Sequence, residues 1–166
     1  MATNSATGAT VAADVMTREV KTIPWDATLR DVAEMLSIHH ISGAPVVDDS
    51  GKMTGIICEA DLINAAKKRA ALPHVAAFGV FLAPEETLKR IYQDGATLRA
   101  EQVMTRDVIT AAPDTPLAEL SRIMTRKRIN RIPVLDGEEL VGIVTREDVL
   151  RGLFGLDNAE DGGAPS

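Results

Sequence analysis

Apolar residues recur at helical spacing in the second half of the chain. Thr115 and Pro116 precede them, a pair that suits an N-cap and a first helical position. This spacing predicts an amphipathic helix that runs to about Lys127. The apolar positions on its buried face are Leu117, Leu120, Ile123 and Met124.

Two short runs rich in β-branched residues follow this helix, at 132–135 and 140–144. They flank a polar turn at 136–139, an arrangement typical of a β-hairpin. A second helix is expected to begin near Thr145. The first half of the chain has the same order of elements, namely a helix at 29–39, strands at 44–47 and 53–58 around a polar turn, and a helix at 59–69.

The order of elements repeats because the sequence repeats. Val15-Met16-Thr17-Arg18 recurs as Val103-Met104-Thr105-Arg106, and the correspondence continues in order to Asp61 and Asp148. Each copy has a short extended start, a helix, two strands and a closing helix, which predicts an α+β fold of two βαββα-type units. A unit of about 50 residues buries too little apolar surface to be stable alone, so we expect the copies to pair and to form clefts between them.

The repeat divides the chain into five segments. Residues 14–69 and 101–155 are the two predicted units. Residues 70–100 are a predicted helical insert, with an apolar patch at 75–82 and a helical stretch at 84–92. Residues 1–13 and 156–166 lack hydrophobic periodicity, and we expect both ends to be flexible.

A glycine, a hydroxyl and a carboxylate close the second copy, as Gly142-x-x-Thr145-x-x-Asp148. A carboxylate there could accept hydrogen bonds from both ribose hydroxyls, and Thr145 with the N–H groups of the helix start could donate to a phosphate. Thr-x-x-Asp is also a capping box that needs no ligand. In the first copy Cys58 replaces the threonine ahead of Asp61, and because a thiol donates weakly we expect that cleft to bind less well or differently.

Together these features resemble a tandem pair of cystathionine beta-synthase (CBS) domains, a Bateman module of the kind found in stand-alone bacterial CBS-pair proteins. The resemblance is carried by the Val-Met-Thr-Arg segments, by the run Asn130-Arg131-Ile132-Pro133-Val134 and by the two glycine-to-aspartate closes. It implies small mixed sheets with helices on one face, units related by a pseudo-two-fold axis, and homodimers. It also implies regulatory binding of AMP, ADP, ATP or S-adenosylmethionine, without catalysis.

The resemblance further implies which residues contact the ligand. Asp148 and Thr145 would hold the ribose and phosphate of one ligand, and Asp61 would serve a second, weaker site. The remaining residues of the Asp148 site would be Thr110, Ala111, Ala112, Asn130, Arg131, Ile132, Pro133 and Arg146. Those of the Asp61 site would be Thr22, Ile23, Pro24, Ala44 and Pro45. The first copy of the repeat has Ser42-Gly43 where the second copy has Asn130-Arg131.

Basic residues gather before the strand at 132–135, as Arg126, Lys127, Arg128 and Arg131. Guanidinium groups suit phosphate, whereas cations at a helix C-terminus also complement its dipole. Arg131 and Arg146 are assigned to ligand contact, and Arg126 and Lys127 to the solvated surface.

Composition excludes several functions. The chain has 18 Lys and Arg against 24 Asp and Glu, a net charge of -6, which disfavours a general affinity for nucleic acid. No apolar stretch approaches the ~20 residues that span a membrane, and a single cysteine without a leader peptide suggests the cytoplasm. His39 and His40 would point apart on a helix, and neither a phosphate-binding glycine loop nor a nucleophile elbow occurs, so no metal site, cofactor or catalytic residue is expected.

Two functions therefore fit the sequence. The first is a sensor in which an adenine nucleotide enters a cleft and changes how the units or two protomers pack, a change that an unidentified effector protein would read. The second is a dimerising scaffold or interaction protein with vestigial ligand clefts. A third class, nucleic-acid binding, is disfavoured by the charge balance.

Overall fold

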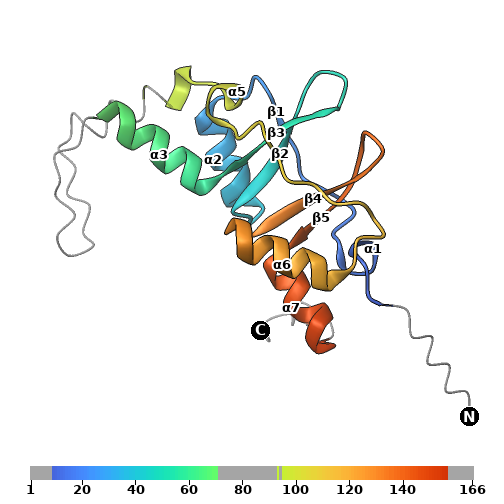
Figure 1. The fold of residues 1–166 in the computed structure, drawn as a ribbon. Helices are drawn as coiled ribbons and strands as arrows, with labels where there is room; N and C mark the ends of the chain where they lie inside the picture. Colours follow the sequence, from blue (N-terminus) through green and yellow to red (C-terminus); the bar gives the residue numbers. More distant parts are fainter. Residues whose placement is uncertain (1–8, 71–92, 94, 157–166) are drawn as a thin grey trace, which may run out of the picture. The chain divides into compact units, whose positions relative to one another are not determined.

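A computed structural model describes residues 9–70, 93 and 95–156 of the chain. The described residues form two compact units (Figure 1). Those within 21–108 are here called the Asp61 unit, and those within 1–20 and 109–166 the Asp148 unit. Each unit combines a small sheet with helices, so the predicted α+β class is confirmed. The apolar patch and the helical stretch predicted at 75–82 and 84–92 lie outside the described residues.

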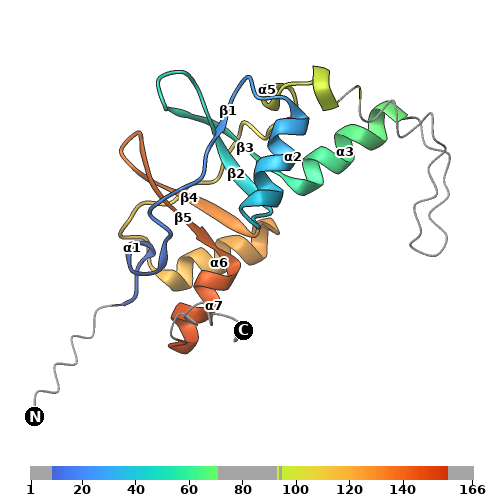
Figure 2. The ribbon, with the colours of Figure 1, turned by 180° about the vertical axis from the view of Figure 1, so that it is seen from behind.

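The Asp61 unit has a three-stranded sheet. Strand β1 runs parallel to β2, which lies in the middle, and β2 runs antiparallel to β3. Helices α2 and α3 pack against each other, and Figure 2 shows α2 lying over β2 and β3. The core is aliphatic, with Val32 and Leu36 of α2 packed with Val46 and Ile57 of the sheet. The bounds are β1 Ile23–Pro24, α2 Leu29–Ile38, β2 Gly43–Val47, β3 Met53–Cys58 and α3 Glu59–Ala70.

Helix α2 begins where Thr28 and Asp31 cap each other. The Thr28 hydroxyl accepts the Asp31 N–H at 3.1 Å, and the Asp31 carboxylate accepts the Thr28 N–H at 3.3 Å. The hydroxyl of Thr28, followed by its N–H, holds the pKa of Asp31 below its ordinary value. The helix therefore starts at the residue that the sequence pattern predicts.

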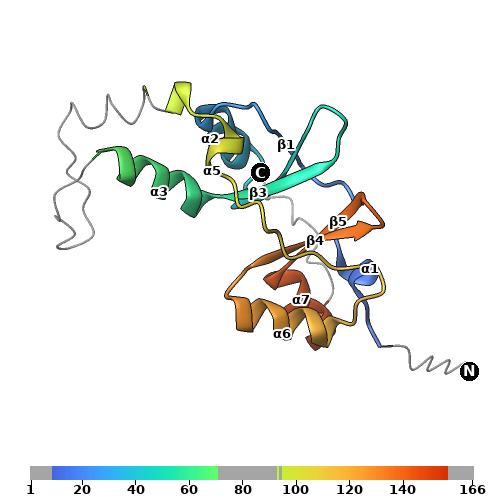
Figure 3. The ribbon, with the colours of Figure 1, turned by 45° about the horizontal axis from the view of Figure 1, so that its top comes forward.

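The Asp148 unit is built around the antiparallel hairpin of β4 and β5. Ala111 forms a parallel bridge to Val134, and so occupies the place beside β4 that β1 has beside β2. Helices α6 and α7 pack together on one side of the hairpin (Figure 3). The helix, hairpin and second helix predicted for this half are confirmed. The bounds are α6 Leu117–Lys127, β4 Arg131–Asp136, β5 Glu139–Thr145 and α7 Arg146–Phe154.

The start of α6 corrects one expectation. Pro116 is the N-cap residue, not the first helical residue, and its backbone is extended with φ -61° and ψ 142°. Leu117 N–H donates to the carbonyl of Thr10 at 2.9 Å, and Ala12 N–H donates to the carbonyl of Thr115 at 2.9 Å. These hydrogen bonds to the distant segment 10–12, which no local sequence pattern indicates, keep Pro116 out of the helix.

The leading segment of each copy packs on the last strand of the other copy. The first leading segment contains α1 (Ala12–Val15), after which Thr17 and Ile143 of β5 exchange backbone hydrogen bonds of 2.9 and 3.0 Å. The second contains α5 (Ala100–Val103), after which Thr105 and Ile56 of β3 exchange two bonds of 2.9 Å. Each segment therefore makes one helical turn before it becomes extended, where the sequence predicts only an extended start.

A methionine from each leading segment covers a strand glycine, and both methionines are buried. A Cβ atom on Gly55 would lie 2.5 Å from Sδ of Met104 and 2.9 Å from the carbonyl oxygen of Thr105. A Cβ atom on Gly142 would collide with Sδ of Met16 and lie 2.8 Å from its Cγ. The repeated glycine is thus explained by the close approach of the leading segment.

Candidate functional site

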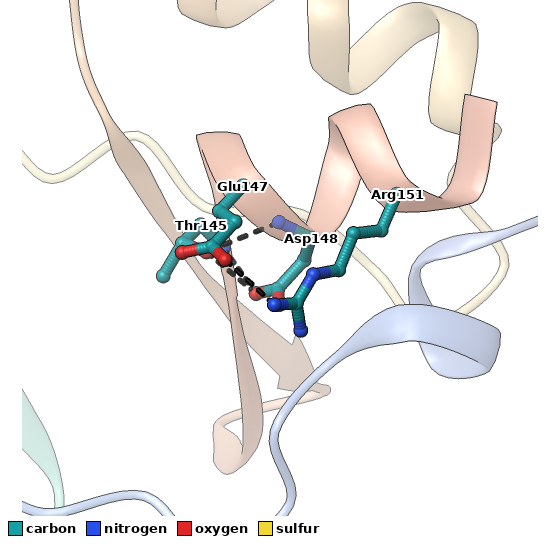
Figure 4. A network of polar contacts seen from close by, with 4 residues as sticks. All are labelled: Thr145, Glu147, Asp148 and Arg151. Carbon is teal, nitrogen blue, oxygen red and sulfur yellow. Dashed lines mark hydrogen bonds and ion pairs between the residues drawn. The ribbon is translucent and has the colours of Figure 1, made fainter. Parts of the chain in front are cut away.

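Asp148 is fixed at the turn between β5 and α7. One of its oxygens, Oδ2, accepts the Thr145 N–H at 2.7 Å and the Thr145 hydroxyl at 2.8 Å. In return the Asp148 N–H donates to the Thr145 hydroxyl oxygen at 3.3 Å (Figure 4). The capping box, one of the two interpretations of this motif, is therefore formed.

Capping leaves part of the carboxylate available. None of the described residues donates a hydrogen bond to Oδ1 of Asp148, and the side chain is only half-buried. A rigidly held carboxylate whose second oxygen receives no hydrogen bond is suited to accept hydrogen bonds from the hydroxyl groups of a ligand. Thr145 is different, because its single hydroxyl proton already goes to Asp148.

Three other predicted site residues meet at the same turn. Arg131 opens β4 directly across from Thr145, which ends β5. The Arg146 N–H donates to the carbonyl of Asn130 at 2.8 Å. The structure therefore brings Asn130, Arg131, Thr145, Arg146 and Asp148 to one edge of the hairpin.

The Arg146 side chain reaches the end of α6. Its Nη2 donates to the carbonyls of Met124 and Ile129 at 3.5 and 3.4 Å. The Met124 carbonyl lies in the last turn of α6, at the negative end of the helix dipole, so the guanidinium stabilises that end. Arg126 and Lys127 at the end of α6, and Arg128 directly after it, are exposed.

The sequence interpretation missed an ion pair next to Asp148. Arg151 Nη2 lies 2.8 Å from Glu147 Oε1, and Figure 4 shows the guanidinium on the same side of α7 as the Asp148 carboxylate. The spacing of the two residues, i and i+4 on a predicted helix, is the signal that could have found it.

The residues predicted around the base divide into two groups. Ala111 N–H donates to the carbonyl of Pro133 at 3.0 Å, which places the exposed Thr110 and Ala112 at the side of β4. The side chains of Ile132 and Pro133 are fully buried in the core. The side chains of Thr110 and Ala112 are therefore accessible beside β4, whereas those of Ile132 and Pro133 are not.

The Asp61 turn repeats this geometry. Asp61 Oδ2 accepts the Cys58 N–H at 2.8 Å, and Glu59 N–H donates to the carbonyl of Ser42 at 3.0 Å. Gly43 lies across from Cys58, as Arg131 lies across from Thr145. Of the remaining predicted residues, Ile23, Ala44 and Pro45 are buried, whereas Thr22 and Pro24 are exposed.

Two negative observations apply to the described residues. Among residues 9–70, 93 and 95–156, no three His, Cys, Asp or Glu side chains are grouped so that they could hold a metal ion. Within the same ranges, no helix combines the length and the apolar character needed to cross a bilayer.

Two α+β repeats, each closed by an aspartate that caps the helix after its last strand, define a tandem-repeat module. A sequence model of the family described as "CBS domain" matches residues 11–68 and 100–155. These matches cover more than half of the chain, which therefore belongs to the CBS domain family. The resemblance on which the sequence interpretation depended is confirmed.

Similar proteins support this assignment. An uncharacterized protein of Methanocaldococcus jannaschii is 31% identical in an alignment of 151 positions, which covers 85% of this chain and 89% of that protein. The structure of the CBS domain of a CBS-domain-containing membrane protein from Sphaerobacter thermophilus is 34% identical with a TM-score of 0.68, over 86% of this chain and 87% of that one. The CBS domain pair of protein MJ0100, solved with 5′-methylthioadenosine and S-adenosyl-L-methionine, is 29% identical with a TM-score of 0.63, over 89% of this chain and 98% of that one.

Other curated relatives are much longer than this chain. The chain spans 24% of the length of a homoserine O-acetyltransferase from Methanococcoides burtonii, to which it is 29% identical over 143 residues. The similarity is thus confined to a part of that enzyme.

Proposed function

We propose that this protein is a regulatory module that binds an adenosine-containing small molecule at the Asp148 turn and at the Asp61 turn, without catalysis of its own. Binding would change how the units or two protomers pack, and an effector protein would respond to that change. The single cysteine suits a reducing cytoplasm.

The observation that carries the proposal is the state of the Asp148 carboxylate. Hydrogen bonds from Thr145 fix its position, and its second oxygen accepts nothing from the described residues. Ribose hydroxyls are the donors that such a carboxylate suits. The bound 5′-methylthioadenosine and S-adenosyl-L-methionine of the MJ0100 pair support a ligand built on adenosine.

The other predicted residues have narrower roles. Thr145 orients Asp148, and Arg131 and Arg146 supply positive charge for a phosphate. Thr110, Ala111 and Ala112 would border the base beside β4, together with the backbone of Asn130, Ile132 and Pro133. In the Asp61 unit the corresponding border would be Thr22, Ile23, Pro24, Ala44 and Pro45.

A matched pair of variants tests the proposal. Asp148→Ala and Asp31→Ala each remove the carboxylate of a capping box, but only Asp148 is assigned to the ligand. Isothermal titration with AMP, ATP, 5′-methylthioadenosine and S-adenosylmethionine should show saturable binding of at least one compound, which Asp148→Ala weakens and Asp31→Ala retains. Circular dichroism checks that the variants are folded. If the wild-type chain binds none of the four compounds, the proposal is contradicted.

Exposed apolar residues on α7 favour a second candidate, a dimerising scaffold whose ligand sites are vestigial. Leu150, Leu153 and Phe154 are 48%, 48% and 73% exposed, which is unusual for side chains of this size on one short helix. The occupant proposed for this surface is a second copy of the chain. Sedimentation of the wild type and of Leu150→Lys/Phe154→Lys distinguishes a dimer from a monomer, and a dimer that binds none of the four compounds would favour the scaffold.

A further inference from the structure

The two proposed sites have the same backbone hydrogen bonds but opposite charge. Arg146 and Glu59 both donate their N–H to the carbonyl that precedes the middle strand of their unit, that of Asn130 and that of Ser42. The two residues therefore occupy equivalent places at the start of α7 and α3, and both are exposed. Where one site has a guanidinium, the other has a carboxylate.

The strand facing each turn adds to this difference. Arg131 is the cross-strand partner of Thr145, whereas Gly43 is the partner of Cys58. The helix that ends beside each site differs in the same sense, because α6 ends in Arg126 and Lys127 and is followed by Arg128. The corresponding residues of the other unit are Ile38, which ends α2, and His39 and His40, which follow it.

The charges close to each aspartate can be compared directly. Among the described residues, the guanidinium groups of Arg131 and Arg146 belong to the turn that holds Asp148, and Glu147 forms an ion pair with Arg151. Near Asp61, Glu59 adds a second negative charge, and the equivalents of Arg131 and Arg151 are Gly43 and Asn64. The residues at the Asp148 turn therefore favour an anion more than those at the Asp61 turn do.

From this contrast we infer that the two sites take different classes of adenosine compound. The Asp148 site takes a phosphorylated adenosine nucleotide, whose phosphate Arg131 and Arg146 neutralise. The Asp61 site takes an adenosine derivative without phosphate, either neutral or positively charged. The inference rests on the proposed function, since it names the ligand class of those same two sites.

Exchanging one pair of charges tests the inference on the full chain. Arg146→Glu gives position 146 the charge that the Asp61 site has at Glu59, and Glu59→Arg does the reverse. The control is Arg122→Glu, the same charge reversal at a side chain that is 62% exposed on α6 and belongs to neither site. Each variant is titrated calorimetrically with AMP and with 5′-methylthioadenosine, and Asp148→Ala and Asp61→Ala assign each ligand to its site.

The expected pattern is specific. Arg146→Glu lowers the affinity for AMP about tenfold or more and leaves the affinity for 5′-methylthioadenosine unchanged, because a charge-assisted contact with phosphate is lost from one site only. Glu59→Arg adds a second equivalent of bound AMP, and Arg122→Glu changes neither ligand. AMP binding that is lost in Asp148→Ala but insensitive to both exchanges would overturn this inference alone. Failure of both ligands to bind the wild type would instead overturn the proposed function and the inference with it.

Discussion

The Asp148 unit and the Asp61 unit fold alike but present different chemistry at the same turn. In both, an aspartate accepts the N–H of the residue that ends the last strand, at 2.7 and 2.8 Å. That residue is Thr145 in one unit, whose hydroxyl adds a further bond to the aspartate, and Cys58 in the other. Apolar periodicity and the turns thus maintain the fold, while a few polar positions are free to change what each unit binds.

The strand glycines should give the largest effect on stability. Gly55→Ala and Gly142→Ala each force a methyl group against the methionine of a leading segment, and overpacking of this kind costs about 1–3 kcal/mol. Gly55→Ala should be the more severe of the two, since the Thr105 carbonyl also lies in the way and cannot rotate aside. Urea denaturation measures both.

Shortening the methionine sharpens this comparison. Met16→Ala should partly restore Gly142→Ala, whereas Met104→Ala should fail to restore Gly55→Ala. Gly95→Ala is the control, because no atom lies within 4 Å of the added methyl group. Equal stability of wild type, Gly55→Ala and Gly142→Ala would show that the leading segments do not pack on these strands.

Exchanging the capping residues should have the next largest effect. Thr145→Cys removes the hydroxyl that both donates to and accepts from Asp148, and should destabilise the chain by about 1 kcal/mol. Cys58→Thr gives Asp61 the same hydroxyl and should stabilise the chain by about 0.5–1 kcal/mol. Thermal or urea unfolding tests this, and two changes of the same sign would contradict it.

Two non-glycine residues in the described part of the chain have a left-handed backbone, and replacing them should have a smaller effect on stability. Arg128 and His40 follow α6 and α2 at equivalent positions, with φ of 54° and 51°. Glycine tolerates this conformation, so Arg128→Gly and His40→Gly should each stabilise the chain by about 0.5 kcal/mol after the entropy of the unfolded glycine is subtracted. Arg126→Gly, inside α6, should instead destabilise it by about 1 kcal/mol.

A substitution in the hairpin turn of the Asp61 unit should have the smallest effect on stability. The Ser50 hydroxyl donates to Asp48 at 2.6 Å, and this bond, aided by the N–H groups of Lys52 and Ser50, lowers the pKa of Asp48. Because the folded pKa is depressed, the stabilisation is present above the ordinary value of 3.8 and is lost as the pH falls through the folded value. Ser50→Ala should move the pKa of Asp48 back toward 3.8 in an NMR titration, and an unchanged titration would refute this.

Much of the fold was predictable from local pattern. The spacing of Leu117, Leu120 and Met124 located α6, and the polar turn before Leu140 located the hairpin. The exchange of leading segments was not predictable, because the pairing of Thr17 with Ile143 joins residues far apart in the chain and leaves no local pattern. The position of Pro116 as an N-cap depends on the same kind of pairing.

The candidate site was predictable in place but not in detail. The Thr-x-x-Asp pattern located Asp148 at a strand-to-helix turn, where capping and ligand binding call for the same residues. The pattern does not reveal that only Oδ2 is used in the cap, nor that Ile132 and Pro133 turn their side chains into the core. Both depend on packing around the turn.

Removing the ribose hydroxyls from the ligand tests the central claim most directly. The full chain is titrated calorimetrically with AMP and with its 2′,3′-dideoxy analogue, which keeps the base and the phosphate. If Asp148 holds the ribose, the analogue binds about tenfold or more weakly, because the carboxylate loses its hydrogen-bond donors. Equal affinity for the two compounds would contradict the account.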